Sequence, residues 1–180
     1  PLLGGNKARV RKYAYQIASA MRFIHASGKL HRDMKADNVF VTPHDEIKVG
    51  DVGLVTNVDK DGYYRARGQG QGHYLYRSPE SYVQDEKGEC KYGPPDDVWA
   101  CALIFFEMIV GCTVDKYQKH PLEFNAKYQQ MPVARCPDLG KKWVAEVGKI
   151  DEGFGKMFRE IFDFDYKKRA SAGRMVEMLK

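Results

Sequence analysis

A carboxylate, an ammonium group and an amide lie close together in one short segment of this sequence. Residues 31–38 read HRDMKADN and supply these groups at Asp33, Lys35 and Asn38, and a second motif, DVG, begins thirteen residues later at Asp51. Transfer of a phosphoryl group from a Mg²⁺-bound nucleotide requires oxygen ligands for the metal, a carboxylate that accepts a hydroxyl proton and a cation near the moving phosphate. The residue types and their spacing therefore indicate phosphoryl transfer.

Five motifs, in order, resemble the signature of eukaryotic-type protein kinases. HRDxKxxN resembles the catalytic loop of that family, and DVG stands where the family usually carries DFG. Three later segments resemble the APE motif that closes the activation segment, the start of a buried central helix, and an element whose arginine pairs with the APE glutamate. They are SPE at 78–80, DDVWA at 96–100 and DYKKR at 165–169. The resemblance covers essentially the whole chain.

The resemblance implies an α+β fold that is mainly helical, with a small β-hairpin at the catalytic site. It places residues 1–180 in the C-terminal lobe of a protein kinase domain. No glycine-rich loop or lysine-bearing strand precedes the catalytic loop, and the glycines within 68–72 have neither a strand nor a helix around them. Because the chain also begins with Pro1, we expect a fragment that lacks its N-lobe and is inactive by itself.

By resemblance, four residues of the two acidic motifs, and Phe40 just after the first, have roles in the site. Asp33 is the expected catalytic base, and Lys35 is expected to bind and stabilise the transferred phosphate. Asn38 and Asp51 are the expected ligands of Mg²⁺, and through it of ATP, because hard oxygen donors suit this cation. Phe40 matches the position that forms the floor beneath the adenine, with an ordinary place in the hairpin core as the alternative. The expected cofactors are ATP and Mg²⁺.

Other motif residues are expected to support the site rather than to react. Asp97 resembles the buried aspartate that hydrogen-bonds the backbone of the catalytic loop, and Glu80 and Arg169 resemble an internal ion pair of the family. His31 is expected to pack and hydrogen-bond beneath the site. Arg32 is expected to meet a phosphate or an acid from the activation segment.

Hydrophobic periodicity predicts the elements that position these motifs. Apolar residues at helical spacing between Asn6 and Ser27 predict an amphipathic helix that leads into the catalytic loop. Two β-branched runs, 39–41 and 47–49, predict a hairpin that brings the two acidic motifs side by side. From 54 to 76 the chain is polar, glycine-rich and without periodicity, which indicates a mobile activation segment.

Three further stretches predict core helices. Residues 98–108 are apolar nearly all round, which is typical of a helix that is buried on every side. Apolar stripes across 154–162 and 175–179 predict amphipathic helices whose aromatic and methionine side chains pack in the core.

Two residues depart from the Ser/Thr-kinase pattern that Lys35 otherwise favours. His73 stands where that pattern has a threonine that hydrogen-bonds the base and the lysine, and we expect the imidazole to donate a bond in its place. Val52 replaces the phenylalanine of DFG, and by resemblance this removes an aromatic ring from the hydrophobic column that links the two lobes; as a β-branched apolar residue, Val52 is still expected to pack there.

Hydroxyl groups are scarce in the expected activation segment. Between Thr56 and Ser78 the sequence has no serine or threonine, which argues against activation by a phosphothreonine in the middle of the segment. Tyr63 and Tyr64 are the expected sites if phosphate regulates this segment, and regulation without phosphate is the alternative.

Composition and charge predict a soluble intracellular protein. The net charge of +5 comes from scattered basic residues, which favours a solvated surface over nucleic-acid binding. The longest apolar run, 98–110, is too short to cross a bilayer and contains Glu107. No signal peptide or CxxC pair is present. We expect a cytoplasmic location, with a nuclear one left open, and no nucleic-acid or membrane partner.

Three functions are compatible with the motifs. The first is an active Ser/Thr protein kinase that transfers the γ-phosphate of ATP to a protein hydroxyl; its partners are the protein substrate, ATP and the missing N-lobe of the same polypeptide. The second is a pseudokinase, a scaffold or binding module with a kinase-like fold, which His73 and Val52 suggest. The third, a small-molecule phosphotransferase, is disfavoured because the SPE motif and the long activation segment build a groove for a peptide. The intact acidic motifs favour the first.

Overall fold

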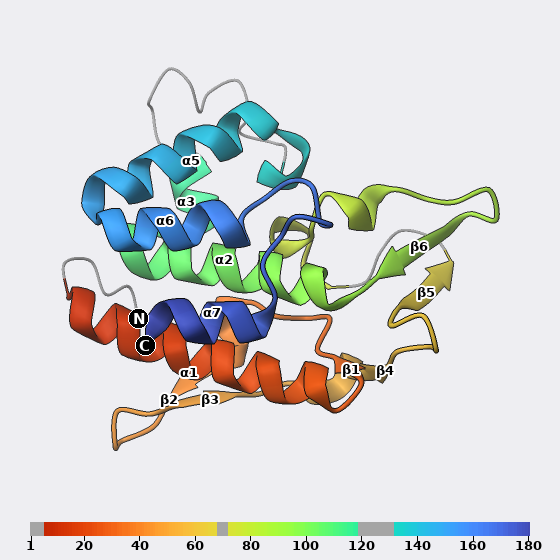
Figure 1. The fold of residues 1–180 in the computed structure, drawn as a ribbon, viewed down its shortest axis with the longest axis horizontal. Helices are drawn as coiled ribbons and strands as arrows, with labels where there is room; N and C mark the ends of the chain where they lie inside the picture. Colours follow the sequence, from red (N-terminus) through yellow and green to blue (C-terminus); the bar gives the residue numbers. More distant parts are fainter. Residues whose placement is uncertain (1–5, 68–71, 119–131) are drawn as a thin grey trace.

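The computed structural model describes residues 6–67, 72–118 and 132–180. Its helices are α1 (Lys7–Ala26), α2 (Pro94–Val110), α3 (Val114–Gln118), α5 (Pro137–Ile150), α6 (Glu152–Ile161) and α7 (Ala172–Leu179). Its strands are β1 (Lys29–Leu30), β2 (Val39–Val41), β3 (Ile47–Val49), β4 (Thr56–Asn57), β5 (Tyr64–Arg67) and β6 (Glu89–Tyr92). Figure 1 shows α2 crossing the middle of the molecule, with α5 and α6 on one side and α1 and α7 on the other. The fold is α+β and mainly helical, as predicted.

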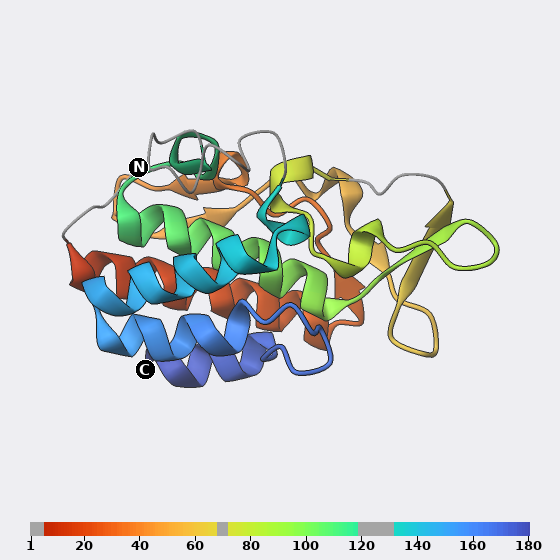
Figure 2. The ribbon, with the colours of Figure 1, turned by 90° about the horizontal axis from the view of Figure 1, so that it is seen from above.

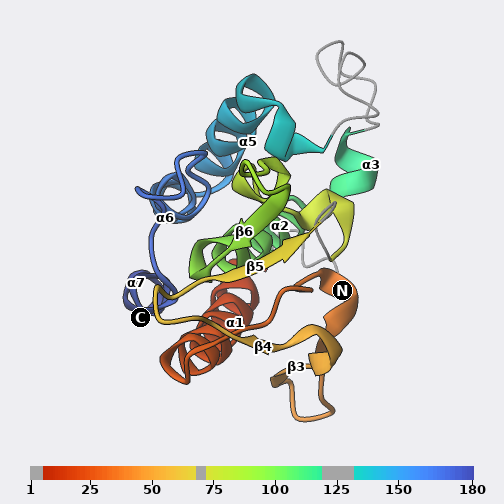
Figure 3. The same ribbon diagram turned by 90° about the vertical axis from the view of Figure 1, so that its right-hand side faces the viewer.

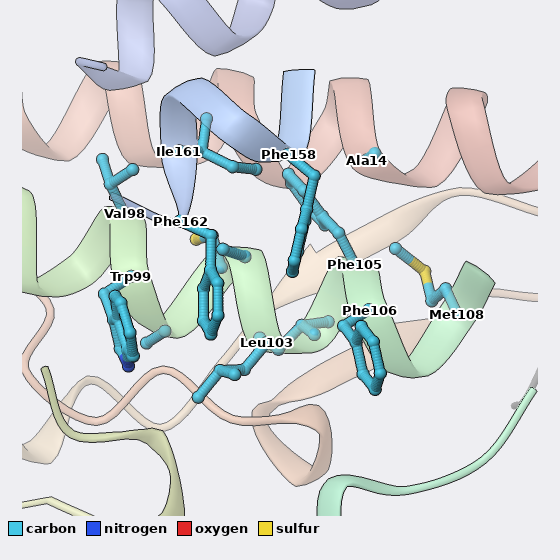
Figure 4. Close-up of a cluster of buried hydrophobic side chains, with 14 of the residues drawn as sticks. Ala14, Val98, Trp99, Leu103, Phe105, Phe106, Met108, Phe158, Ile161 and Phe162 are labelled. Carbon is cyan, nitrogen blue, oxygen red and sulfur yellow. The ribbon is translucent and has the colours of Figure 1, made fainter. Parts of the chain in front are cut away.

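Helix α2 is the centre of the core. Every residue from Asp97 to Ile109 is buried, which confirms the prediction of a helix that is covered on all sides. Pro94 lies in its first turn, and Gly111, at φ 70°, ends it. Figure 4 shows the rings of Trp99 and Phe162 face to face, with their centroids 4.1 Å apart and their planes at 18°. The aromatic stripe of α6 therefore packs directly on α2.

Helix α1 leads the chain into the catalytic loop. The side chain of Asn6 caps it by accepting a hydrogen bond of 3.0 Å from the backbone nitrogen of Arg9, and Gly28, at φ 67°, follows its end. The helix packs against α2 and α7. Its buried face consists of Val10, Tyr13, Ala14, Ile17, Ala18 and Met21. The helix predicted between Asn6 and Ser27 is confirmed.

The two late helices are confirmed as well. The buried residues of α6 are Phe154, Gly155, Met157, Phe158 and Ile161. In α7 they are Ala172, Met175, Val176 and Leu179. Figure 2 shows α5, α6 and α7 side by side along one side of the molecule, and all three contribute buried side chains to the main core. These helices form the base on which α2 holds the catalytic loop.

The strands form three separate two-stranded antiparallel sheets: β1 with β4, β2 with β3, and β5 with β6. The hairpin β2–β3 was predicted, and its register pairs Val39 with Val49 and Val41 with Ile47. The other two sheets were not predicted.

The prediction of a segment without regular structure from 54 to 76 is wrong for much of its described part. It contains β4, β5 and a 3₁₀ turn at Tyr74–Tyr76. Strand β5 is stabilised by hydrogen bonds to β6, which lies more than twenty residues further along the chain. Local periodicity does not reveal so distant a partner, and the strand was therefore not predicted. Most of the glycine cluster at 68–72 lies outside the described residues.

All four cysteines are free, and Cys90, Cys101 and Cys136 are buried. Within the described ranges, no helix is both long enough and apolar enough to span a membrane.

Candidate active site

The catalytic-loop segment is held from below by α2. The backbone nitrogens of His31 and Arg32 donate hydrogen bonds of 2.9 Å to the two carboxylate oxygens of Asp97. Asp97 is itself buried, and His25 adds a contact of 2.8 Å to the same carboxylate. Arg32 has φ 69°, a left-handed conformation that costs a non-glycine residue free energy and persists only where the surrounding structure enforces it. The predicted role of Asp97 is confirmed.

Asp33 is the point at which the loop's polar groups converge. Its Oδ2 atom accepts hydrogen bonds from Lys35 Nζ at 2.9 Å and from Asn38 Nδ2 at 3.2 Å. Asn38 Nδ2 also donates to the backbone oxygen of Asp33 at 2.7 Å. The Oδ1 atom accepts from the backbone nitrogen of His73 at 3.2 Å. The structure therefore brings three of the predicted site residues into direct contact.

The ammonium group of Lys35 is kept charged by its neighbours. Its hydrogen bond to Asp33 is the main cause that raises its pKa, and the charges of Asp33, Asp51 and Asp37 add to the effect. A lysine with a raised pKa remains protonated at neutral pH. It can therefore act as a fixed positive charge for a phosphate.

Asp51 reaches the same site through the β2–β3 hairpin. The backbone nitrogen of Gly50 donates to the backbone oxygen of Asn38 at 2.9 Å, and His31 Nε2 lies 3.1 Å from the backbone oxygen of Gly50. These contacts fasten the second acidic motif to the first. Asp51 is exposed and has φ 52°, a left-handed conformation that aspartate tolerates better than most side chains.

The donor set of Asn38 and Asp51 fits Mg²⁺. A carboxylate and an amide oxygen are hard ligands, and Mg²⁺ keeps several waters and needs only one or two protein groups besides the phosphates. Both hydrogen bonds of the Asn38 side chain use Nδ2, so neither of them occupies its Oδ1 atom. No group of three or more His, Cys, Asp or Glu residues that could hold a metal occurs among the described residues.

The side chains of Phe40 and Val52 are 55% and 65% exposed. This rules out the alternative that Phe40 is an ordinary residue of the hairpin core. The expectation that Val52 packs in a column linking two lobes stays a prediction, because within the described residues most of its surface is open. The Phe40 ring lies over Gly50, where an added Cβ atom would come within 2.7 Å of the ring. Both side chains are available to something that covers this face.

The predicted role of the His73 imidazole is wrong. The backbone nitrogen of His73, not the ring, contacts Asp33. The ring is stacked on Tyr74, with centroids 5.2 Å apart, and lies edge-on to Tyr76 at 5.6 Å. Gly72 makes the approach possible, since it has φ 90° and an added Cβ atom would lie 2.7 Å from the backbone oxygen of Arg32.

Sequence reasoning missed the contact between Tyr76 and Glu107. The Tyr76 hydroxyl donates to Glu107 Oε1 at 2.9 Å, and the backbone nitrogen of Val114 donates to the same oxygen at 2.8 Å. Burial is the main cause that raises the pKa of Glu107. The signal in the sequence was Glu107 itself, a single acid inside the apolar run 98–110. A buried carboxyl group requires hydrogen-bond partners, so its presence there indicates that some must be found.

The ion pair between Glu80 and Arg169 is confirmed. Arg169 contacts both carboxylate oxygens, with NH1 to Oε1 at 2.5 Å and NH2 to Oε2 at 3.0 Å. Its side chain is fully buried, and that of Glu80 is 14% exposed. Arg169 also donates to the backbone oxygens of Asp163 and Pro95. The pair joins the end of the activation segment to the late helices.

Asp96 lies beside this pair and is expected to make stability depend on pH. Burial, followed by the charge of Glu80, raises its pKa to about 7, from 3.8 for an ordinary aspartate. Between about pH 4 and pH 7 the folded state therefore holds a proton that the unfolded chain releases, so stability falls as pH rises through this interval.

Asp96→Asn should remove this dependence, because an amide can still accept from the backbone nitrogen of Gly93 and can donate to the Ser78 hydroxyl. We expect the melting temperature of the variant, relative to the unsubstituted protein, to rise steadily between about pH 4 and pH 7 and then to level off. If the difference in melting temperature between the two proteins stays constant from about pH 4 to about pH 7, Asp96 does not titrate in this range.

The comparisons with known proteins agree with this geometry. The family model described as "Protein kinase domain" matches residues 5–179. The chain is 34% identical over 112 residues to cyclin-dependent kinase-like 1 of Caenorhabditis elegans. The alignment covers 60% of this chain and 29% of that protein. It is 40% identical over 105 residues to eukaryotic translation initiation factor 2-alpha kinase 3 of Bos taurus. That alignment covers 52% of this chain and 9% of the relative.

A third relative is the interferon-induced, double-stranded RNA-activated protein kinase of Rattus norvegicus, which is 34% identical over 110 residues, or 61% of this chain and 20% of that protein. The chain thus spans less than a third of the length of each of these relatives. It belongs to the eukaryotic-type protein kinase family.

Proposed function

We propose that this chain is the C-terminal lobe of a Ser/Thr protein kinase that transfers the γ-phosphate of ATP to a hydroxyl group of a protein substrate. The observation that carries the proposal is the convergence of Lys35, Asn38 and the His73 backbone on the carboxylate of Asp33. A catalytic base must be held where it can reach a substrate hydroxyl, and here three donors fix its orientation. A pocket lined in part by Asp33, Gly72, His73 and Tyr76 opens beside it.

Each residue of the site has a defined task in this proposal. Asp33 orients the substrate hydroxyl and accepts its proton. Lys35 places a positive charge beside the transferred phosphate. Asn38 and Asp51 hold Mg²⁺, which neutralises the phosphate charge when it is bound. Phe40 supplies the apolar surface beneath the adenine.

Serine or threonine specificity is supported by Lys35, because the family resemblance associates a lysine at this position of the catalytic loop with that specificity. A kinase-like scaffold without catalysis is the second candidate. The exposed Val52 and the turned-away imidazole of His73 are the observations in its favour.

A consequence of this proposal is that the 180-residue chain alone binds nucleotide weakly. In this proposal Asp51, Asn38 and Phe40 form one wall of the nucleotide site, and the exposure of Phe40 supports the view that the described residues do not enclose an adenine. A ligand pocket normally buries most of its ligand, and phosphates left in water gain little from charge pairing. Isothermal titration of the chain with Mg²⁺-ATP is therefore expected to give a Kd of about millimolar or weaker.

The same titration of a longer polypeptide that joins this chain to an N-lobe serves as the control and should show much tighter binding. Micromolar affinity in the 180-residue chain would show that this lobe carries a complete nucleotide site, contrary to the proposal.

A further inference from the structure

A second, small apolar cluster lies next to the catalytic loop and outside the main core. Its buried members are Leu30, Cys90 and Tyr92, and Val58, Tyr64 and Ala66 pack against it. Leu30 immediately precedes the HRD motif, whereas the other members come from the activation segment and from β6. The cluster therefore links three distant parts of the sequence at the start of the catalytic loop.

The guanidinium group of Arg32 extends over this cluster. Its Cζ atom lies 4.0 Å from the centroid of the Tyr64 ring and 5.7 Å from that of Tyr92. Both distances lie within the range of a cation–π attraction, which strengthens when the groups are shielded from water. Arg32 also donates from NH1 to the backbone oxygen of Leu54 at 3.3 Å. The motif predicts a phosphate or an acid of the activation segment as the partner of Arg32, and it does not predict these two tyrosine rings.

The two tyrosines are held by the β5–β6 sheet. Tyr64 and Tyr92 are directly opposite each other in its register, and their ring centroids lie 6.3 Å apart. Figure 3 shows β5 and β6 side by side, with β6 running toward the start of α2. The neighbouring Tyr63 packs so closely on Gly93 that an added Cβ atom there would come within 2.8 Å of its ring. The sheet therefore packs against the start of α2.

Arg32 is joined directly to the catalytic base. Its own backbone is held by Asp97 in a left-handed conformation, and the next residue is Asp33. A shift of the Arg32 side chain toward solvent would remove one of the contacts that enforce this conformation. The position of the Asp33 carboxylate consequently depends both on its own three hydrogen-bond donors and on the contacts that hold the Arg32 guanidinium group.

We propose that Tyr64, with Tyr92 beside it, is a positioning residue that holds Arg32, and through it Asp33, by the face of its ring and without a phosphate. The inference rests on the proposed kinase function of the same site. It fits the sequence, which has no serine or threonine between Thr56 and Ser78.

The test compares three substitutions in a polypeptide that joins this chain to its N-lobe. Tyr64→Leu keeps an apolar side chain in the cluster but removes the ring, and we expect kcat to fall about tenfold with little change in KM for ATP. Tyr64→Phe keeps the ring face and should restore kcat to within about twofold, because the hydroxyl has no part in the proposal. Val58→Ala removes packing from the same cluster without touching Arg32, and it should lower the melting temperature while leaving kcat nearly unchanged. Treatment of the unsubstituted protein with a phosphatase should not reduce its rate.

Amide hydrogen exchange supplies a readout that does not depend on activity. Tyr64→Leu should speed exchange in the peptide that contains Arg32 and Asp33, whereas Tyr64→Phe and Val58→Ala should not. Equal kcat in the leucine and phenylalanine variants, or a phosphatase-sensitive rate, would overturn the inference while leaving the kinase function intact. If the unsubstituted protein transfers no phosphate, the proposed function fails, and exchange alone decides whether Tyr64 positions Arg32.

Discussion

Asp33→Asn is expected to lower the rate of phosphate transfer by about 10²–10⁴-fold, the usual contribution of a positioned general base. The amide retains one oxygen for the donors that converge on this side chain, so the loop should keep its place. It cannot accept the proton of the substrate hydroxyl. The measurement is the rate of transfer from radiolabelled ATP at saturating nucleotide, in a polypeptide that joins this chain to its N-lobe.

Glu46→Gln provides a matched control for this prediction. It is also an acid-to-amide change, but Glu46 is exposed in the turn between β2 and β3, and its rate should equal that of the unsubstituted protein. An Asp33→Asn variant that turns over as fast as this control would remove Asp33 from the chemistry.

Arg169→Ala is expected to have the largest effect on stability. The fully buried guanidinium is paired with Glu80 through two hydrogen bonds. Removing one partner of a buried pair leaves the other charge uncompensated and costs about 3–5 kcal/mol. This is a large part of the 5–15 kcal/mol that typically separates a folded domain from its unfolded state. Urea unfolding of the variant and of the unsubstituted chain measures the difference.

Arg174→Ala is the control for this measurement. Arg174 also pairs with a glutamate, Glu160, but the two side chains are 50% and 44% exposed. Surface pairs of this kind contribute less than about 1 kcal/mol. If the two arginine variants unfold at the same urea concentration, the buried pair does not stabilise the fold as described.

The residues of the candidate site were predictable because short motifs encode them. HRDMKADN places Asp33, Lys35 and Asn38 close together in sequence, and the three side chains hydrogen-bond to one another. The helix from Asp97 to Ile109 was predictable for a different reason: an apolar surface on every side requires complete burial. The hairpin β2–β3 needed only adjacent strands and a turn.

The sheets β1–β4 and β5–β6 could not be predicted in the same way. The pairing of Tyr64 with Tyr92 joins residues that are far apart in the sequence, and the polar segment between them gives no sign of a partner. The role of His73 was misjudged because the side chain was considered and the backbone was not, although the Gly72 beside it was the signal of a close approach. The exposure of Val52 depends on what faces the hairpin, and a local pattern does not contain that information.

The most direct test of the central claim is the transfer assay on the unsubstituted polypeptide that joins this chain to its N-lobe, followed by phosphoamino-acid analysis of the labelled protein substrate. The convergence of Lys35, Asn38 and His73 on Asp33 predicts that label is transferred. The family resemblance at Lys35 predicts that the label is found in phosphoserine or phosphothreonine. It also predicts that chelation of Mg²⁺ stops the transfer. A folded protein that binds its partners but transfers no label with Mg²⁺-ATP would contradict the account and establish a kinase-like scaffold.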